Sequence, residues 1–222
     1  MEIRALEAMK VLTVANRKGG AGKSTCAAHL ALESIKDGIK TIIVDLDPQK
    51  TLEGWWNRRE SDDLPLIDLP EKNSDEILKN LSSKGFELCI VDTPGDASHN
   101  SRLGISLADL VLIPSKPTAP DLSAIGRTIS MVEEQEKKYV FVLTQGIVRA
   151  KATFQASSVL SGFGAVAPAV ISNRTSYASA MGIGNSACEI DKAAEEEIKE
   201  VWKFIKEKLF ESKQNKKSKL VA

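Results

Sequence analysis

The stretch Asn16–Thr25, which reads N-R-K-G-G-A-G-K-S-T, is the most informative part of the sequence. It follows an apolar run, Val11–Ala15, and opens a segment with helical character, Lys23–Lys36. Its three glycines let backbone N–H groups turn inward, because no side chains block an approaching group. The start of the helix adds the positive end of its dipole on the same side. A glycine-rich loop in this context predicts a site for phosphate groups.

The last residues of this loop carry the expected chemistry. The Lys23 ammonium is expected to reach β- and γ-phosphates, the Ser24 hydroxyl to ligate Mg²⁺, and Thr25 to bond an α-phosphate. The strict pattern G-x-x-x-x-G-K-[ST] is not met, because Arg17 occupies the first glycine position. The alternative is a turn that binds no ligand, but such a turn needs neither three glycines nor a lysine beside a hydroxyl.

Short apolar runs alternate with helix-like segments along most of the chain. The expected strands are Val11–Ala15, Thr41–Asp45, Leu66–Leu69, Glu87–Asp92, Leu110–Pro114, Tyr139–Thr144 and Val166–Ile171. The expected helices are Lys23–Lys36, Thr51–Arg59, Asp75–Ser82, Asp121–Lys137, Thr153–Ser161 and Asp191–Phe210. Continuously apolar strands are typical of a parallel sheet covered on both faces. The pattern predicts an α/β fold with a doubly wound, mostly parallel sheet and right-handed crossovers.

The composition is that of an ordinary globular domain with balanced charge. Of 222 residues, 42% are hydrophobic and 27% charged, and 30 Lys and Arg balance 30 Asp and Glu. No linker rich in Gly, Ser or Pro divides the chain, so we expect one domain at 1–211 and a disordered basic tail at 212–222. Zero net charge excludes a global basic field, so DNA binding would need a local patch or several copies.

Nothing in the sequence indicates a membrane span or an oxidising compartment. The N-terminal residues lack the apolar stretch of a signal peptide, and no window approaches the ~20 apolar residues that a membrane span needs. The cysteines are odd in number and form no C-x-x-C pair, which fits reduced thiols better than a disulfide framework or a zinc site. We therefore expect a cytoplasmic protein.

Acidic residues follow two of the expected strands. Asp45 and Asp47 lie in V-D-L-D-P-Q at Val44–Gln49, and Asp92 lies in C-I-V-D-T-P-G at Cys89–Gly95. Ligands of doubly wound sheets bind beyond the carboxyl ends of the strands, so these carboxylates are expected on the side of the glycine-rich loop. The alternative is an ordinary turn, because Asp and Pro are common at strand ends.

Together these three segments resemble the ParA/MinD superfamily of deviant Walker A ATPases, most closely its short plasmid-partition ParA proteins. K-G-G-A-G-K-S-T is similar to the deviant Walker A box, D-x-D-P-Q to switch I, and D-T-P-G to the Walker B and switch II region. The resemblance implies a P-loop NTPase fold that binds ATP and Mg²⁺. The implied ATP-binding residues are Lys18, Gly19, Gly20, Ala21, Gly22, Lys23, Ser24, Thr25, Asn173 and Arg174.

The resemblance also implies a catalytic set of Lys18, Lys23 and Asp47. Lys18 stands at the family's second, "signature" lysine, which contacts phosphates across a nucleotide-sandwich dimer. An added cation at the γ-phosphate would stabilise transition-state charge. Asp47 would orient or activate the attacking water. For Lys18 the alternative is an ordinary solvated lysine.

Ser24, Asp45 and Asp92 are the metal residues that the resemblance implies. Asp92 would bind Mg²⁺ through a water, and Asp45 would support the Mg²⁺ shell. Asn173 and Arg174 would lie near the base, for which a plain loop cap is the alternative.

In such ParA proteins, an ATP-bound homodimer binds DNA without sequence preference, and a ParB-like centromere-binding protein stimulates slow ATP hydrolysis. The resemblance therefore implies a role in plasmid or chromosome partition, with the protein associated with the nucleoid when ATP is bound. A dimer could double a local basic strip, although a solvated face is the alternative for each member. The candidates are Arg149, Lys151, Arg174, Lys213, Lys216, Lys217 and Lys219.

Two other classes stay open. A MinD-like positioning ATPase would use the amphipathic helix Asp191–Phe210 to bind membrane. The acidic run Glu195–Glu197 suits a helix docked on the sheet better, so no stable membrane association is expected. A ligase of the dethiobiotin-synthetase type shares the loop and the sheet but needs a substrate pocket, and the D-x-D-P-Q segment favours the switch.

Overall fold

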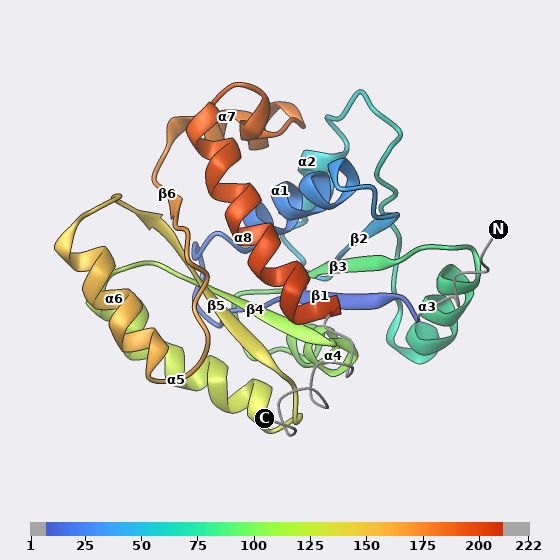
Figure 1. Cartoon of the computed structure of the whole chain (residues 1–222). Helices are drawn as coiled ribbons and strands as arrows, with labels where there is room; N and C mark the ends of the chain where they lie inside the picture. The colour runs from blue at the N-terminus through green and yellow to red at the C-terminus, as the bar shows by residue number, and fades with distance from the viewer. Residues whose placement is uncertain (1–7, 211–222) are drawn as a thin grey trace, which may run out of the picture.

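A computed structural model describes residues 8–210, and these form one sheet in the order β2-β3-β1-β4-β5-β6 (Figure 1). The strands are β1 (Lys10–Val14), β2 (Thr41–Asp45), β3 (Leu88–Asp92), β4 (Leu110–Ser115), β5 (Tyr139–Gly146) and β6 (Ile171–Ser172). Every neighbouring pair is parallel, so all six strands end at the same edge of the sheet. The predicted fold class is confirmed.

The connections between the strands are mostly helical. The α-helices are α1 (Lys23–Lys36), α2 (Thr51–Trp56), α3 (Ser74–Ser83), α4 (His99–Leu107), α5 (Ala119–Glu133), α6 (Lys151–Ser161), α7 (Thr175–Ile183) and α8 (Lys192–Phe210). Short 3₁₀ helices, η1 (Glu71–Asn73) and η2 (Ala187–Glu189), precede α3 and α8.

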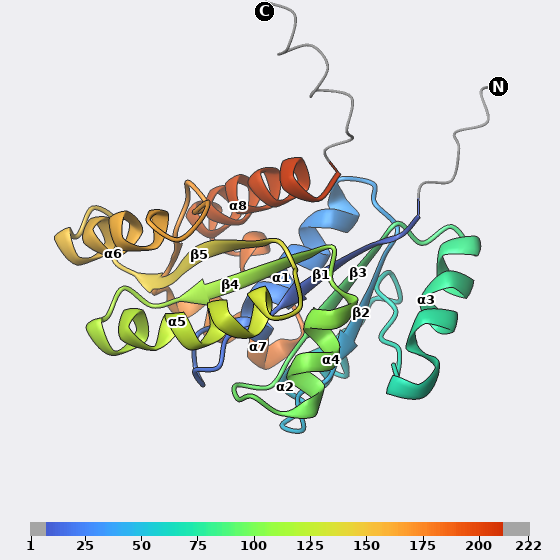
Figure 2. The same ribbon diagram turned by 90° about the horizontal axis from the view of Figure 1, so that it is seen from below.

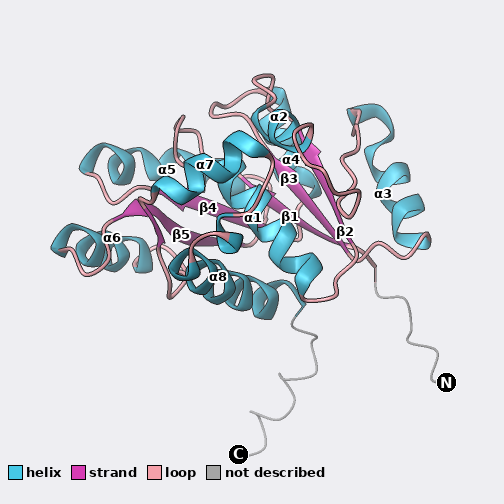
Figure 3. Cartoon of the chain, turned by 90° about the horizontal axis from the view of Figure 1, so that it is seen from above, coloured by secondary structure: helices cyan, strands magenta, loops and turns pink. Residues whose placement is uncertain are grey.

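Helices cover both faces of the sheet, as Figures 2 and 3 show. On one face, α1 and α8 pack over Leu12 and Ile90 in the largest buried cluster. On the other face, α4, α5 and α6 pack over Val111 and Phe141, and α3 packs against a third cluster around Val91. Burial on both faces is the physical reason for the continuously apolar strands.

Helix α8 docks on the sheet through the apolar stripe that its sequence predicts. The buried residues of this stripe are Ile198, Val201, Trp202, Ile205 and Leu209. The Trp202 indole N–H donates to Asp37 Oδ2 at 2.9 Å, at the end of α1. The stripe is therefore used inside the fold rather than presented to solvent.

Two predicted strands are only marginally formed. The segment around Leu66 makes a single parallel bridge to Ile43, because Pro65 and Pro70 on either side have no N–H to donate to a ladder. The predicted strand Val166–Ile171 is likewise reduced to one bridge at Val166 and the two-residue β6, with Pro168 between them.

Helices α4 and α7 were not predicted. The predicted single domain at 1–211 is represented by the sheet and helices of residues 8–210. Its boundary and the basic tail at 212–222, with Lys213, Lys216, Lys217 and Lys219, lie outside the described residues.

His29 links α1 to the segment before α8. Its Nδ1 donates to the Thr25 carbonyl at 2.8 Å, and its Nε2 accepts the Ala187 N–H at 3.1 Å, which fixes the neutral tautomer. Its ring packs edge-on against Tyr177, with centroids 5.1 Å apart. Burial lowers the pKa of His29 from 6.5 to about 4, although the bond to Thr25 acts the other way. The fold therefore requires the neutral ring of His29.

This pKa predicts acid-sensitive stability. The unfolded state binds the proton more tightly, so the contribution of His29 is complete above pH 6.5 and is lost as the pH falls toward 4. Between pH 7.5 and 5.0, we expect the free energy of unfolding to fall by about 2 kcal/mol more in the unsubstituted protein than in His29→Gln. Urea unfolding at both pH values measures this difference, and equal losses in the two proteins would contradict it.

Candidate functional site

The loop between β1 and α1 is held open by its neighbours. Gly20 and Gly22 have φ angles of 72° and 87°, which residues with a Cβ rarely adopt. Thr144 Oγ1 donates to the Ala21 carbonyl at 2.8 Å, and Gln145 Nε2 donates to the Gly20 carbonyl at 2.9 Å. These bonds from the end of β5 engage two loop carbonyls. Gly22, the N-cap of α1, offers no side-chain cap, so the first amides of the helix remain available for an anion.

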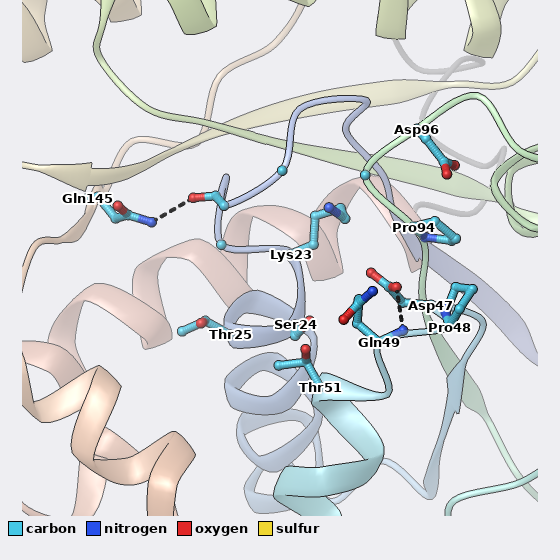
Figure 4. Close-up of a pocket in the computed structure, with 14 residues that line it drawn as sticks. Lys23, Ser24, Thr25, Asp47, Pro48, Gln49, Thr51, Pro94, Asp96 and Gln145 are labelled. Atoms are coloured by element: carbon cyan, nitrogen blue, oxygen red, sulfur yellow. Dashed lines mark hydrogen bonds between the residues drawn. The ribbon is translucent and has the colours of Figure 1, made fainter.

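A cavity of about 540 Å³ opens above this loop (Figure 4). Three segments converge on it: the loop itself, the segment after β2 and the segment after β3. The lining residues are Gly19, Gly20, Gly22, Lys23, Ser24, Thr25, Asp47, Pro48, Gln49, Thr51, Pro94, Gly95, Asp96 and Gln145. The structure thus brings together most of the residues predicted from the three sequence motifs.

Gly95 joins the segment after β3 to the phosphate loop. A Cβ at this position would lie 3.2 Å from the backbone of Gly19 and 3.3 Å from Lys23 Nζ. These contacts are tighter than ordinary van der Waals contacts, so any side chain would push the two segments apart. Lys23 itself is only 7% exposed. Its ammonium is therefore held at the junction of the two segments, beside the cavity.

Asp92 is fully buried at the end of β3. In the described part of the chain, neither of its carboxylate oxygens has a hydrogen-bond partner. Burial raises its pKa to about 7, and the nearby Asp45 carboxylate adds to the rise, while the Ser24 hydroxyl and the Lys23 ammonium oppose it. Asp92 is also the register partner of Asp45.

These residues fit Mg²⁺. A buried carboxylate without a partner is costly, and a cation would satisfy it. The Ser24 hydroxyl is a second oxygen ligand of the kind that Mg²⁺ takes. No cluster of three or more His, Cys, Asp or Glu forms a metal cage within residues 8–210. Mg²⁺ usually combines one or two protein ligands with phosphate oxygens and water.

Asp45 has both carboxylate oxygens engaged by the backbone. Its Oδ1 accepts the Asp47 N–H at 3.0 Å, and its Oδ2 accepts the Glu53 N–H at 2.9 Å. Burial raises the pKa of Asp45, and these two bonds oppose the rise. The Asp45 carboxylate thus links the loop after β2 to the start of α2 through two backbone hydrogen bonds. Its part in the Mg²⁺ shell stays a prediction.

Asp47 lines the cavity itself. Its Oδ1 accepts the Gln49 N–H at 2.9 Å, a turn visible in Figure 4. The side chain is half-buried, so a water molecule bound in the cavity can reach the remaining carboxylate oxygen.

Lys18 lies outside the set of residues that line the cavity. Its Nζ is 3.3 Å from Oδ2 of Asp121, at the start of α5. The Thr118 hydroxyl donates to the same carboxylate, and the Asp121 Oδ1 atom is buried with no partner among residues 8–210. The charge of Lys18 is therefore held within its own chain, on the β4–α5 side of the loop. Contact with a second subunit stays a prediction.

A smaller cavity of about 270 Å³ adjoins the loop on its other side. Asn173 and Arg174 line it, together with Gly22 and Thr25 of the loop region. The guanidinium of Arg174 is bound by Glu197 Oε1, with Nη2 at 2.8 Å and Nε at 3.0 Å. Arg174 is thus part of the wall and is ion-paired there, and its place in the basic strip stays a prediction.

The family model described as the CobQ/CobB/MinD/ParA nucleotide binding domain matches residues 12–176. The chain belongs to this family. The predicted resemblance to ParA and MinD is thereby confirmed, and the matched segment, described as a nucleotide binding domain, contains the phosphate loop.

Curated ParA-type relatives cover most of the chain. It is 31% identical over 190 residues to "Protein ParA" of Rhizobium radiobacter, covering 80% of this chain and 85% of that protein. It is 29% identical over 204 residues to "Maintenance of carboxysome distribution protein A" of Halothiobacillus neapolitanus, covering 86% and 93%. The MinC:MinD complex of Aquifex aeolicus shares the fold, with a TM-score of 0.76 at 16% identity, covering 92% of this chain and 98% of that chain.

Sequence reasoning missed several residues of this ParA/MinD-type site. Thr144 and Gln145 lie at the end of the apolar strand β5 without a recognisable motif, and only the sheet order places them against the loop. Two carboxylates on distant helices form ion pairs with predicted site residues. Glu197 on α8 pairs with Arg174, and Asp121 on α5 pairs with Lys18. A carboxylate 23 residues beyond Arg174 gives no local signal of their pairing.

The site predicts that Lys23→Ala loses nucleotide binding. Removing the ammonium deletes charge-assisted bonds to phosphate worth about 3 kcal/mol, which is about 100-fold in affinity. Isothermal titration with an ATP analogue measures the loss. Lys36→Ala, at the exposed end of the same helix, is the matched control and should bind like the unsubstituted protein. Wild-type affinity in Lys23→Ala would refute the assignment of the loop.

Proposed function

We propose that the chain is an ATPase that works as a dimerising switch and drives the partition of plasmid or chromosomal DNA. The observation that supports this most is the single cavity where the phosphate loop, the D-x-D-P-Q segment and the T-P-G segment meet. A simple nucleotide-binding protein needs only the first. The other two segments lie where they can respond to the γ-phosphate, which is what a switch requires.

Different residues bind the phosphates, hold the metal ion and orient the attacking water. The loop amides and Lys23 bind and orient the phosphates, and Ser24 and Asp92 would hold Mg²⁺, which neutralises charge on the phosphate oxygens. Asp47 orients a water molecule against the γ-phosphorus. As the new oxygen–phosphorus bond forms, the bond to the β,γ-bridging oxygen breaks and a proton of the water passes to the Asp47 carboxylate and then to solvent, which leaves ADP and phosphate. Gly95, tight against Gly19 and Lys23, transmits the loss of the γ-phosphate to the segment after β3.

Dimerisation brings Lys18 into the partner's site. Within one chain Lys18 pairs with Asp121, so the cross-subunit contact requires this ion pair to open. Breaking this partially buried ion pair costs free energy and so opposes dimerisation. The ATP phosphates of the second subunit can offset this cost, because they offer Lys18 more negative charge than one carboxylate does. This requirement makes the dimer depend on ATP.

The ParA relative supports DNA partition as the role. The proposed stimulating partner is a ParB-like centromere-binding protein, and the proposed ligand of the ATP-bound dimer is DNA of any sequence. Arg149 and Lys151 are exposed at the start of α6 and remain candidates for DNA contact. The proposed location is the cytoplasm, on the nucleoid when ATP is bound. The carboxysome-distribution relative makes a protein assembly the alternative cargo.

A MinD-like use of α8 as a membrane anchor is disfavoured. Its apolar stripe is already buried against the sheet, so membrane insertion would expose the core. No helix in residues 8–210 combines the length and apolarity needed to cross a bilayer.

Co-sedimentation tests the role. With the ATP analogue, we expect binding to plasmid DNA of any sequence and none to anionic liposomes, and ADP should abolish DNA binding. Binding to liposomes but not to DNA would favour the MinD-like role. ATP turnover that requires a small carboxylic-acid metabolite and ignores DNA would favour a ligase.

Lys18→Ala is expected to bind the ATP analogue but to remain monomeric. The unsubstituted protein should double its mass in light scattering with the analogue and not with ADP. Lys138→Ala, an exposed lysine at the opposite edge of the sheet, should behave like the unsubstituted protein. Unchanged dimers in Lys18→Ala would remove its proposed role across the interface.

Asp47→Ala is expected to bind and dimerise normally while losing turnover. General-base and water-orienting groups typically contribute about 10²–10⁴-fold, so a loss of at least about 100-fold is expected. Phosphate release under saturating ATP measures it. Asp62→Ala, an exposed aspartate in the following loop, serves as the control. Turnover that survives in Asp47→Ala would assign water activation elsewhere.

A further inference from the structure

One carboxylate on α8 receives four hydrogen bonds from the far end of the sheet. Glu197 Oε2 accepts the Ser172 N–H at 3.0 Å and the Tyr177 hydroxyl at 2.9 Å. Glu197 Oε1 accepts Nε and Nη2 of Arg174 at 3.0 Å and 2.8 Å. These donors come from β6, the turn after it and α7. Glu197 thus fixes three consecutive parts of the chain at once.

The three donor residues form a wall of the 270 Å³ cavity beside the phosphate loop. Glu197 itself does not line this cavity, so its effect is exerted through the wall. The Ser172 side chain in the wall is buried, with only 7% of the residue exposed. Its hydroxyl lies close enough to the Glu197 carboxylate to help lower the pKa of Glu197, so the side chain of Ser172 as well as its N–H ties the wall to α8.

The same wall is tied to the phosphate side of the site. Tyr177, held by Glu197, packs edge-on against His29, and His29 donates to the carbonyl of Thr25. Thr25 borders both cavities. The position of the wall relative to the phosphate loop therefore depends on a chain of contacts that starts at Glu197.

The hydrogen bonds that Glu197 accepts also stabilise its ionised carboxylate. Burial alone would raise its pKa, but the bonds from Arg174, Ser172 and Tyr177 together hold the pKa below its usual value. The ionised carboxylate compensates the Arg174 guanidinium, with Asp191 Oδ2 a further 3.7 Å from Nη1. The guanidinium in the wall is therefore ion-paired with two carboxylates rather than offered to an anion, which suits an uncharged ligand such as a nucleotide base.

We propose that Glu197 is a positioning residue that holds the base-binding wall in place and so couples helix α8 to nucleotide recognition. This inference rests on the proposed function, because it requires that the nucleotide's phosphates occupy the loop. The triphosphate fixes one end of the ligand, and the 270 Å³ cavity next to the loop receives the base. Loss of Glu197 leaves three donors unpaired and lets the wall move away from the loop.

The test compares ATP with inorganic tripolyphosphate, which carries the phosphates but no base. In Glu197→Ala, we expect the affinity for ATP to fall about 10-fold and that for tripolyphosphate to stay within about 2-fold. Glu196→Ala, the exposed neighbour on α8, should leave both unchanged. Tyr177→Phe removes a single donor and should give a smaller loss in the same direction, without the risk of unfolding.

The outcomes separate the possibilities. Selective loss of ATP affinity in Glu197→Ala and Tyr177→Phe supports the inference. Equal loss for both ligands, or no loss for either, overturns it while leaving the nucleotide site intact. If the unsubstituted protein binds neither ATP nor tripolyphosphate, the proposed function fails, and the inference fails with it.

Discussion

The structure depends on one close contact, where the backbone of the phosphate loop meets the segment after β3. A Cβ at Gly95 would lie only 3.2 Å from the Gly19 backbone and 3.3 Å from Lys23 Nζ, and the Lys23 ammonium lies close enough to the buried Asp92 to oppose the rise in its pKa. Burying such groups without full hydrogen bonding costs several kcal/mol, so the sheet and its helices must stabilise an arrangement that is complete only with a ligand. An energetically unfavourable local arrangement of this kind is typical of functional sites.

Most of the fold is readable from the sequence, because a parallel sheet buried on both faces requires continuously apolar strands. The prediction was wrong where tertiary contacts outweigh local pattern. Prolines truncate the ladder around Leu66 and Val166, although both stretches are apolar. Helix α7 (Thr175–Ile183) is made of small and weakly patterned residues, and it gains its stability from Tyr177 and Ala180 packing into the core rather than from amphipathic periodicity.

The site was predictable only where backbone chemistry demands particular residues. Glycines with positive φ and a lysine at a helix start are visible in any such loop, and the carboxylates at strand ends are placed by topology alone. The bracing contacts are not visible, because they join residues far apart in the chain. The pairing of Lys18 with Asp121 and of Arg174 with Glu197 depends on how α5 and α8 dock, which no local pattern encodes.

The central claim is that the loop amides and Lys23 form a preorganised cradle for a triphosphate. Calorimetric titration of the unsubstituted protein with a non-hydrolysable ATP analogue tests it most directly. We expect saturable binding of one nucleotide per chain, tighter with Mg²⁺ than without it and displaced by ADP. The absence of measurable affinity for the magnesium nucleotide at any concentration tested would contradict it.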